Sequence, residues 1–186
     1  MSHYRLKDNY LRFYLKCIEP NKKKILKQPL KILPKWQVIM GLQFENLVLS
    51  NRNSIQQILN IDASEIVNDN PYFQRKSASQ AGCQIDYMIQ TKFGTCYLCD
   101  IKFSAQTLHV NVIDEIKEKI KNLKRPKNYS IRPVLIHVNG VSDEIIESEF
   151  FSSIIDFRLL FRKSRRLIKT FLLFNSANLA DLFFSF

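Results

Sequence analysis

An aspartate and a lysine lie two residues apart in CDIKFSAQ, residues 99–106, a segment that is otherwise typical of a buried strand. Residues i and i+2 of a strand point to the same face of a sheet, so Asp100 and Lys102 would lie side by side. Cys99 and Ile101 would then point to the opposite face. Charged side chains are seldom buried without a partner. The pair therefore belongs either to a solvated edge or to a functional site.

Two further carboxylates come near this pair when the flanking elements are predicted from the sequence. Asp86 lies in the strand-like segment QIDYMIQ, residues 84–90. The turn TKFGT, whose glycine tolerates positive φ, joins this segment to a strand over residues 95–104, which predicts a β-hairpin. Glu45 lies beside the apolar stripe of a helix that is predicted to precede the hairpin.

These residue types suit metal-dependent hydrolysis of a phosphodiester. A metal neutralises the scissile phosphate and generates hydroxide near neutral pH, and Mg²⁺ binds through one or two carboxylates while keeping several waters. We expect Asp86, Asp100 and the backbone carbonyl of Ile101 to hold Mg²⁺ or Mn²⁺, with Glu45 as a ligand directly or through water. Lys102 would orient or deprotonate the attacking water and offset charge in the transition state.

Each of these side chains also has an ordinary structural interpretation. Glu45 would be an exposed helix acid and Asp86 a residue at the edge of the hairpin. Asp100 and Lys102 would form a surface ion pair that contributes less than about 1 kcal/mol to stability. The spacing alone leaves both interpretations open.

The remaining pattern predicts an α/β domain around the hairpin. Apolar residues recur at helical spacing from residue 36, and again over 108–124, where the helix is amphipathic. The segment 132–139 predicts a buried central strand. Ser142 precedes acids in SDEIIESEFF, as at a helix start, and the apolar pattern continues through IIDFRLLF. NDNPYFQRKSASQAG, residues 68–82, predicts a loop with room for one short strand.

The chain divides into three parts. Residues 1–35 predict a helical segment and a basic loop in which Pro29 and Pro34 break regular structure, and residues 36–161 form the α/β domain. Residues 162–186 are basic and then apolar, but polar residues interrupt them too often for a transmembrane helix. We expect this tail to form a helix on the domain or on a partner, rather than to contact a membrane surface.

Composition restricts the partners and the compartment. Lysine and arginine number 28 against 17 acids, a formal charge of +11 that favours a polyanion such as DNA or RNA. The sequence opens without a secretory signal, so we expect reduced cysteines and a cytoplasmic location. Cys96 and Cys99 form a CxxC pair, but no second pair follows at the spacing of a zinc site. Both are expected to be ordinary strand cysteines.

The order helix–strand–strand–helix–strand, with acid…acid-x-lysine on the hairpin, matches the core of the restriction-endonuclease-like fold of the PD-(D/E)xK nucleases. The chain also resembles the C-terminal domain of a group of prokaryotic AAA-type ATPases. The resemblance covers about residues 4–157 and is carried by YRLKDNYLRFYLKCIEP, GLQFENLV, CQIDYMIQTKFGTCYLCDIKFS and IRPVLIHVNGVSDEIIESEFFSSIIDF. It implies a restriction-endonuclease-like domain of unknown function, in which Glu45, Asp86, Asp100 and Lys102 match the site positions of the family.

Three features depart from those relatives. Their strand motif is usually Glu-x-Lys, whereas this chain has Asp100-Ile-Lys102, and the tail from about residue 162 does not match them. No GxxxxGK[ST] motif occurs, so ATP hydrolysis by a P-loop is excluded for this sequence. We expect the chain to be a DNA nuclease. The main alternative is a module with the same fold that is catalytically inactive and serves in nucleic-acid binding or assembly. A third alternative is an expressed remnant that retains no function. A homodimer and a separate ATPase partner both stay open.

Overall fold

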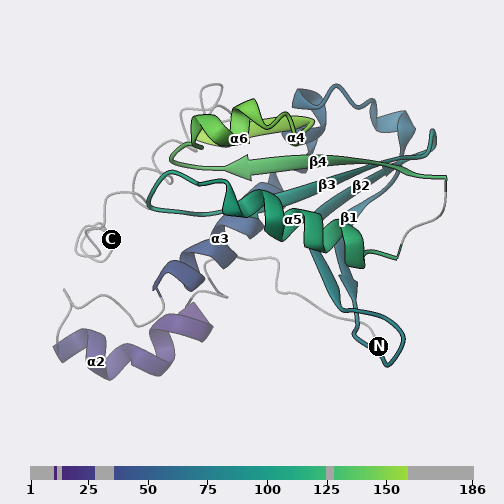
Figure 1. Cartoon of the computed structure of the whole chain (residues 1–186). Helices are drawn as coiled ribbons and strands as arrows, with labels where there is room; N and C mark the ends of the chain where they lie inside the picture. Colours follow the sequence, from purple (N-terminus) through teal and green to yellow (C-terminus); the bar gives the residue numbers. More distant parts are fainter. Residues whose placement is uncertain (1–10, 12–13, 28–35, 125–127, 159–186) are drawn as a thin grey trace.

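A five-stranded mixed sheet forms the centre of the computed structural model, which describes residue 11 and residues 14–27, 36–124 and 128–158. The strands are β1 (Ile66–Gln74), β2 (Cys83–Thr91), β3 (Thr95–Lys102), β4 (Ser130–His137) and β5 (Ser153–Asp156). The α-helices are α2 (Lys22–Lys27), α3 (Trp36–Ser50), α4 (Arg52–Ile58), α5 (Asn111–Asn122) and α6 (Asp143–Glu147). Short helical turns occupy Tyr14–Ile18, Glu19–Asn21 and Ala63–Glu65. Helices cover both faces of the sheet (Figure 1).

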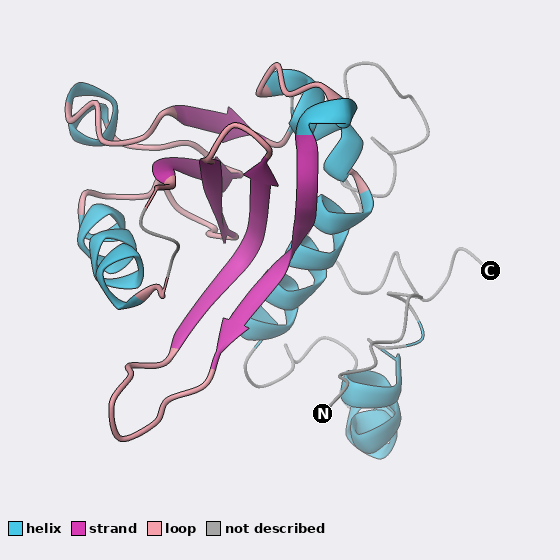
Figure 2. Cartoon of the chain, turned by 90° about the vertical axis from the view of Figure 1, so that its right-hand side faces the viewer, coloured by secondary structure: helices cyan, strands magenta, loops and turns pink. Residues whose placement is uncertain are grey.

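The strands follow one another in sequence order across the sheet. Strands β1, β2 and β3 are antiparallel neighbours, whereas β3, β4 and β5 are parallel, and α5 makes the crossover from β3 to β4. The mixed α/β fold class is confirmed. The predicted helix–strand–strand–helix–strand elements are present as α3, β2, β3, α5 and β4, but α4 and β1 lie between α3 and β2. The loop with one short strand predicted over residues 68–82 is wrong in its first half, where β1 is a nine-residue strand that pairs with β2. Figure 2 shows α3 and α5 on opposite sides of the sheet.

The hairpin turn between β2 and β3 depends on a glycine. Gly94 has a φ of +74°, and a Cβ built there would lie 3.0 Å from the carbonyl oxygen of Asn128. An L side chain would therefore be strained both by the backbone conformation and by this contact. The predicted turn is confirmed, and it fixes the register Tyr87↔Cys99 that brings β2 against β3.

Two segments differ from the sequence-based prediction near the ends of the described chain. The helix that was expected to continue from residue 142 ends at Glu147, and Glu149 then takes a positive φ of 49°. The following SIID pairs in parallel with β4 and forms β5 instead, because β4 offers it a free edge. Ser142 precedes α6, but its side chain makes no capping hydrogen bond.

The basic segment before the domain is the second place where the structure differs from the prediction. The expected loop begins with a helix, α2, because NKKKILK contains no breaker before Pro29. Pro29, Pro34 and the predicted tail helix over 162–186 lie outside the described residues. Among the residues that are described, no helix is both long and apolar enough to cross a bilayer.

The two faces of the sheet have separate apolar layers. Phe44 and Val48 of α3 pack with Cys99 and Ile101 of β3 on one face. Ile116 of α5 packs with residues of β4, α6 and the following loop on the other. Cys83, Cys96 and Cys99 are buried and unbonded to one another, as expected for ordinary strand cysteines. Asp100 and Lys102 therefore point to the α5 face, opposite Ile101.

Candidate active site

The candidate site lies where the β2–β3 ladder ends. The last residue pair of this ladder is Tyr87↔Cys99, so Asp86 and Asp100 follow just beyond the regular pairing. The carboxylate of Asp86 then replaces a backbone partner, because its Oδ2 accepts a hydrogen bond of 2.9 Å from the Ile101 amide. The predicted hairpin thus brings Asp86 against the Asp100-Ile-Lys102 segment.

Asp100 is buried although it is charged. Only 5% of its side chain is exposed. The ammonium of Lys119, on α5, bonds to Oδ1, and Nζ of Lys102 lies 3.4 Å from Oδ2. This Oδ2 has no hydrogen-bond donor among the described residues, so only the ionic contact with Lys102 compensates it. The interpretation of Asp100 and Lys102 as a surface ion pair is therefore wrong for Asp100.

Lys102 is held between two carboxylates. Besides Asp100, its Nζ contacts Oε2 of Glu115 on α5 at 2.5 Å, and 27% of the Lys102 side chain is exposed. Burial lowers the pKa of Lys102, but Asp100 and then Glu115 outweigh this and raise it above its ordinary value. Lys102 is thus a cation at neutral pH, held in place by these two carboxylates.

Asp86 has the opposite electrostatic balance. Burial and then the negative charge of Asp100 raise the pKa of Asp86, while Lys119, the Ile101 amide and Lys102 lower it only in part. Two carboxylates that share one partly buried region disfavour each other's ionised form. An added cation near Asp86 and Asp100 would relieve this repulsion.

The structure brings together four of the five positions predicted for the site. Asp86, Asp100, Lys102 and the backbone of Ile101 meet at the end of the hairpin, although the observed contact of Ile101 is through its amide rather than its carbonyl. Glu45 lies half-buried on α3, the helix that packs on the opposite face of β3. Within the described residues, no group of three or more His, Cys, Asp or Glu side chains could hold a metal. The role of Glu45 stays a prediction.

Glu115 and Lys119 complete the charged cluster, and neither was predicted from the sequence. They are four residues apart on α5, so they lie on one side of the helix, and both reach the β3 pair. Their spacing was visible, but lysines and acids at such spacing are usual on exposed helix faces. Only the packing of α5 against the sheet distinguishes these two.

A histidine lies beside Lys102 on the next strand. Lys102 is in register with His137 of β4, which is in register with Asp156 of β5, so the three residues form a row at the carboxyl ends of the parallel strands. Burial lowers the pKa of His137, with Asp156 acting in the opposite direction, so the imidazole is neutral at pH 7. Its Nδ1 is buried and lacks a hydrogen-bond partner in the described part of the chain.

No known family profile matches the chain, and no curated protein matches it. Several solved chains are similar to part of it, and two of them are described here. One is a repair endonuclease from Pyrococcus abyssi, with a TM-score of 0.39 and 16% identity over 60% of this chain and 44% of that chain. The other is EndoMS in a complex with dsDNA, with a TM-score of 0.32 and 11% identity over 56% of this chain and 42% of that chain. The matches span less than half of each of these two solved chains. At these TM-scores they carry no argument about function.

Proposed function

We propose that this protein is a metal-dependent DNA nuclease that hydrolyses phosphodiesters at the end of the β2–β3 hairpin. The observation that carries the proposal is the pairing of two adjacent carboxylates with a fixed lysine. Asp86 bonds to the Ile101 amide, and Asp100 on the next strand contacts Lys102. Buried charges of this kind cost stability unless they are well paired, so a catalytic use explains them better than a structural one.

The residues present fit a small divalent cation. Asp86 and Asp100 offer two carboxylates, and Oδ2 of Asp100 is buried without a hydrogen-bond donor among the described residues. Mg²⁺ commonly binds through one or two carboxylates and keeps several waters, so two protein ligands suffice. Bound there, Mg²⁺ or Mn²⁺ would neutralise a phosphate and lower the pKa of a coordinated water. Glu45 and the Ile101 carbonyl stay as proposed further ligands.

The charges of the cluster explain why a cation is needed. The cluster has a net formal charge of −1. It consists of three carboxylates and two ammonium groups, those of Asp86, Asp100, Glu115, Lys102 and Lys119. This cluster would repel the phosphate of a nucleic acid. A divalent cation would bring the net charge to +1, which favours one phosphodiester.

Lys102 would stabilise charge rather than remove a proton. Its raised pKa keeps the ammonium charged at neutral pH, and a charged ammonium can donate hydrogen bonds but cannot accept a proton. The pairing with Asp100 and Glu115 fixes where this cation lies. We therefore assign Lys102 to orienting the attacking water and to offsetting negative charge on the phosphate in the transition state.

Cleavage of supercoiled plasmid and of single-stranded DNA in Mg²⁺ or Mn²⁺ tests the proposal. Asp86→Asn and Lys102→Met should each lower the rate by about 100-fold or more, because each removes a group that acts on the reacting phosphate. Lys92→Met is the matched control, since Lys92 is exposed in the hairpin turn and away from the carboxylates. Metal-dependent cutting that survives both substitutions would exclude this site.

The second candidate function is a non-catalytic nucleic-acid-binding or assembly module. It is favoured by the two lysines that already neutralise Asp100. In that case DNA binding would persist without cutting, and Lys102→Met would change little. If the chain is related to the C-terminal domain of AAA-type ATPases, as we propose, a separate ATPase chain would be its partner. A homodimer is the other assembly to test. Sedimentation of the chain alone distinguishes a dimer from a monomer.

A further inference from the structure

Two acid-free segments of the sequence meet at one end of the molecule. No aspartate or glutamate occurs from residue 70 to residue 85, which spans the β1–β2 hairpin, or from residue 119 to residue 124, at the end of α5. The first contains Arg75 and Lys76, and the second contains Lys121 and Lys124. All four of these side chains are exposed. These two segments thus place four exposed cations on this part of the surface without a carboxylate in either segment.

Gln74 holds the two segments together. This residue is only 5% exposed, and its Nε2 donates hydrogen bonds of 2.7 Å to the carbonyl oxygens of Ala81 and Asn122. Its Oε1 accepts from the amide of Lys124 at 2.9 Å. One buried amide therefore links the two sides of the hairpin tip to the last turn of α5. The two backbone segments that carry the four cations are therefore held next to each other.

The hairpin is a projecting two-stranded ribbon. The ladder between β1 and β2 continues to Gln74↔Cys83, and the tip closes through the bridge Ser77↔Gln80. Figure 2 shows this ribbon extending beyond the rest of the sheet. A two-stranded ribbon of this kind has the dimensions to lie against a DNA groove, with basic residues placed on the flanking phosphates.

The basic surface continues into the candidate site. Cys83, which pairs with Gln74 where the ladder ends before the tip, donates a hydrogen bond of 3.3 Å from its Sγ to the carbonyl oxygen of Lys119, whose side chain bonds to Asp100. Ile85, Ile116, Lys119 and Asp100 line one small hollow between them. A polyanion lying across the ribbon tip and the end of α5 would therefore approach Asp100 from the α5 face.

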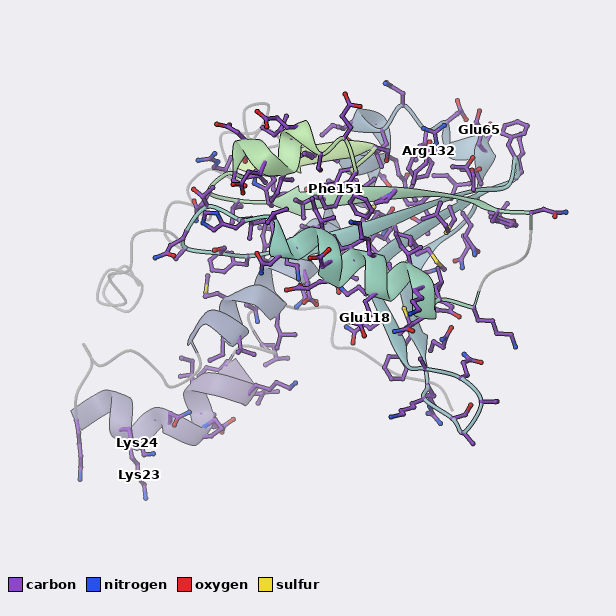
Figure 3. The ribbon with its side chains drawn as sticks, viewed as in Figure 1. Lys23, Lys24, Glu65, Glu118, Arg132 and Phe151 are labelled. Carbon is purple, nitrogen blue, oxygen red and sulfur yellow. The ribbon has the colours of Figure 1, made fainter. Side chains whose placement is uncertain are left out.

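We infer that Arg75, Lys76, Lys121 and Lys124 form a DNA-binding arm, on which the phosphates of a duplex lie next to the cleavage site. The identity of the ligand rests on the proposed function, whereas the position of the surface rests on the contacts of Gln74. Lysines at the end of α5 also interact favourably with the helix dipole. That interaction does not explain Arg75 and Lys76, which lie outside the helix. Glu118, one turn earlier on the exposed side of α5, bounds the surface (Figure 3).

The test measures binding separately from cleavage. Fluorescence anisotropy of a labelled DNA duplex is recorded in EDTA, over a series of salt concentrations, for Arg75→Ala/Lys76→Ala and for Lys121→Ala/Lys124→Ala. The control is Lys23→Ala/Lys24→Ala, which removes the same charge from α2, where both side chains point away from the sheet (Figure 3). Thermal unfolding of all variants checks that each is folded.

Each arm variant should weaken binding at least tenfold and reduce the slope of log K against log salt by about 1.8, because two phosphate contacts are lost. The control should bind within twofold of the parent protein. Equal losses in all three variants would mean that only net charge matters, and unchanged binding by the arm variants would exclude the surface. Tighter binding of single-stranded RNA than of duplex DNA would also overturn the assignment. If the arm variants lose binding but the parent protein never cuts DNA, the proposed nuclease function is contradicted while the DNA-binding arm is supported.

Discussion

Successive residues of β3 enter two layers of opposite character. Cys99 and Ile101 point to the α3 face, where they pack with Phe44 and other apolar side chains. Asp100 and Lys102 point to the α5 face, where three carboxylates and two lysines lie together. The same strand thus contributes to an apolar core and to a charged cluster that is partly closed off from water.

The difference separates the side chains that stabilise the fold from those that do not. Burying apolar surface is favourable by about 25 cal/mol per Å², whereas buried ion pairs often contribute nothing net to stability. The apolar clusters on the two faces therefore supply the free energy of folding. The charged cluster around Asp100 imposes a cost that these contacts offset. A charged layer of that kind is better explained by what it binds than by what it stabilises.

Truncation in the apolar core should give the largest loss of stability. Ile136 of β4 is fully buried in the α3-side layer, so Ile136→Ala should lower the free energy of unfolding by about 2–5 kcal/mol. The reason is the lost burial together with the cavity that the smaller side chain leaves. Urea unfolding followed by circular dichroism measures this change.

The matched control is the same substitution on the surface. Ile146 of α6 is 55% exposed, so Ile146→Ala should change the free energy of unfolding by no more than about 0.5 kcal/mol. Similar losses at the two isoleucines would contradict the assignment of the α3-side layer as the stabilising core.

Addition of metal should act on the charged layer alone. After treatment with EDTA, Mg²⁺ at about 100 times its Kd should stabilise the protein by about 2.7 kcal/mol, because it would bind the folded state only. Thermal unfolding at constant ionic strength measures the effect. Asp86→Asn and Asp100→Asn should abolish it, since each removes one of the two proposed ligands.

A surface aspartate supplies the control for this metal effect. Asp114 lies on α5 with 82% of its side chain exposed and pairs with Lys117. Asp114→Asn should keep the full Mg²⁺ stabilisation. If all three variants respond to Mg²⁺ like the parent protein, the cation does not bind at the hairpin.

The contrast between the faces also separates what sequence could predict from what it could not. Alternation along β3 was enough to place Asp100 and Lys102 on one face, because strand geometry has a period of two. The turn at Gly94 then brought Asp86 to the same place. Both inferences depend on residues within one hairpin, where local geometry fixes the distances.

The site residues on α5 could be identified only from the tertiary structure. Glu115 and Lys119 reach β3 across 13 and 19 residues of sequence, and only the packing of the helix decides which of its charges face the sheet. β5 likewise exists because β4 offers an edge, rather than because SIID has a distinctive pattern. For Glu45, the sequence predicts the helix but does not give its orientation relative to the hairpin.

The smallest effect should come from loosening Lys102 without removing it. In Glu115→Gln the amide keeps the shape of the side chain but loses the charge that contacts Nζ of Lys102 at 2.5 Å. Cleavage should fall by less than about tenfold, the scale of one ion pair worth about 1 kcal/mol. The pH profile gives a second readout. Asp100 and Glu115 raise the pKa of Lys102, so losing one of them lowers this pKa.

Because Lys102 is proposed to act as a cation, activity should fall as pH rises through its pKa, and in Glu115→Gln this alkaline fall should begin at a lower pH. Glu118→Gln is the control, since Glu118 lies on the exposed side of the same helix and should leave the profile unchanged (Figure 3). If activity instead rises with pH through this pKa, and the rise begins at a lower pH in Glu115→Gln, Lys102 acts in its neutral form. The charged layer would then serve to remove a proton rather than to stabilise negative charge.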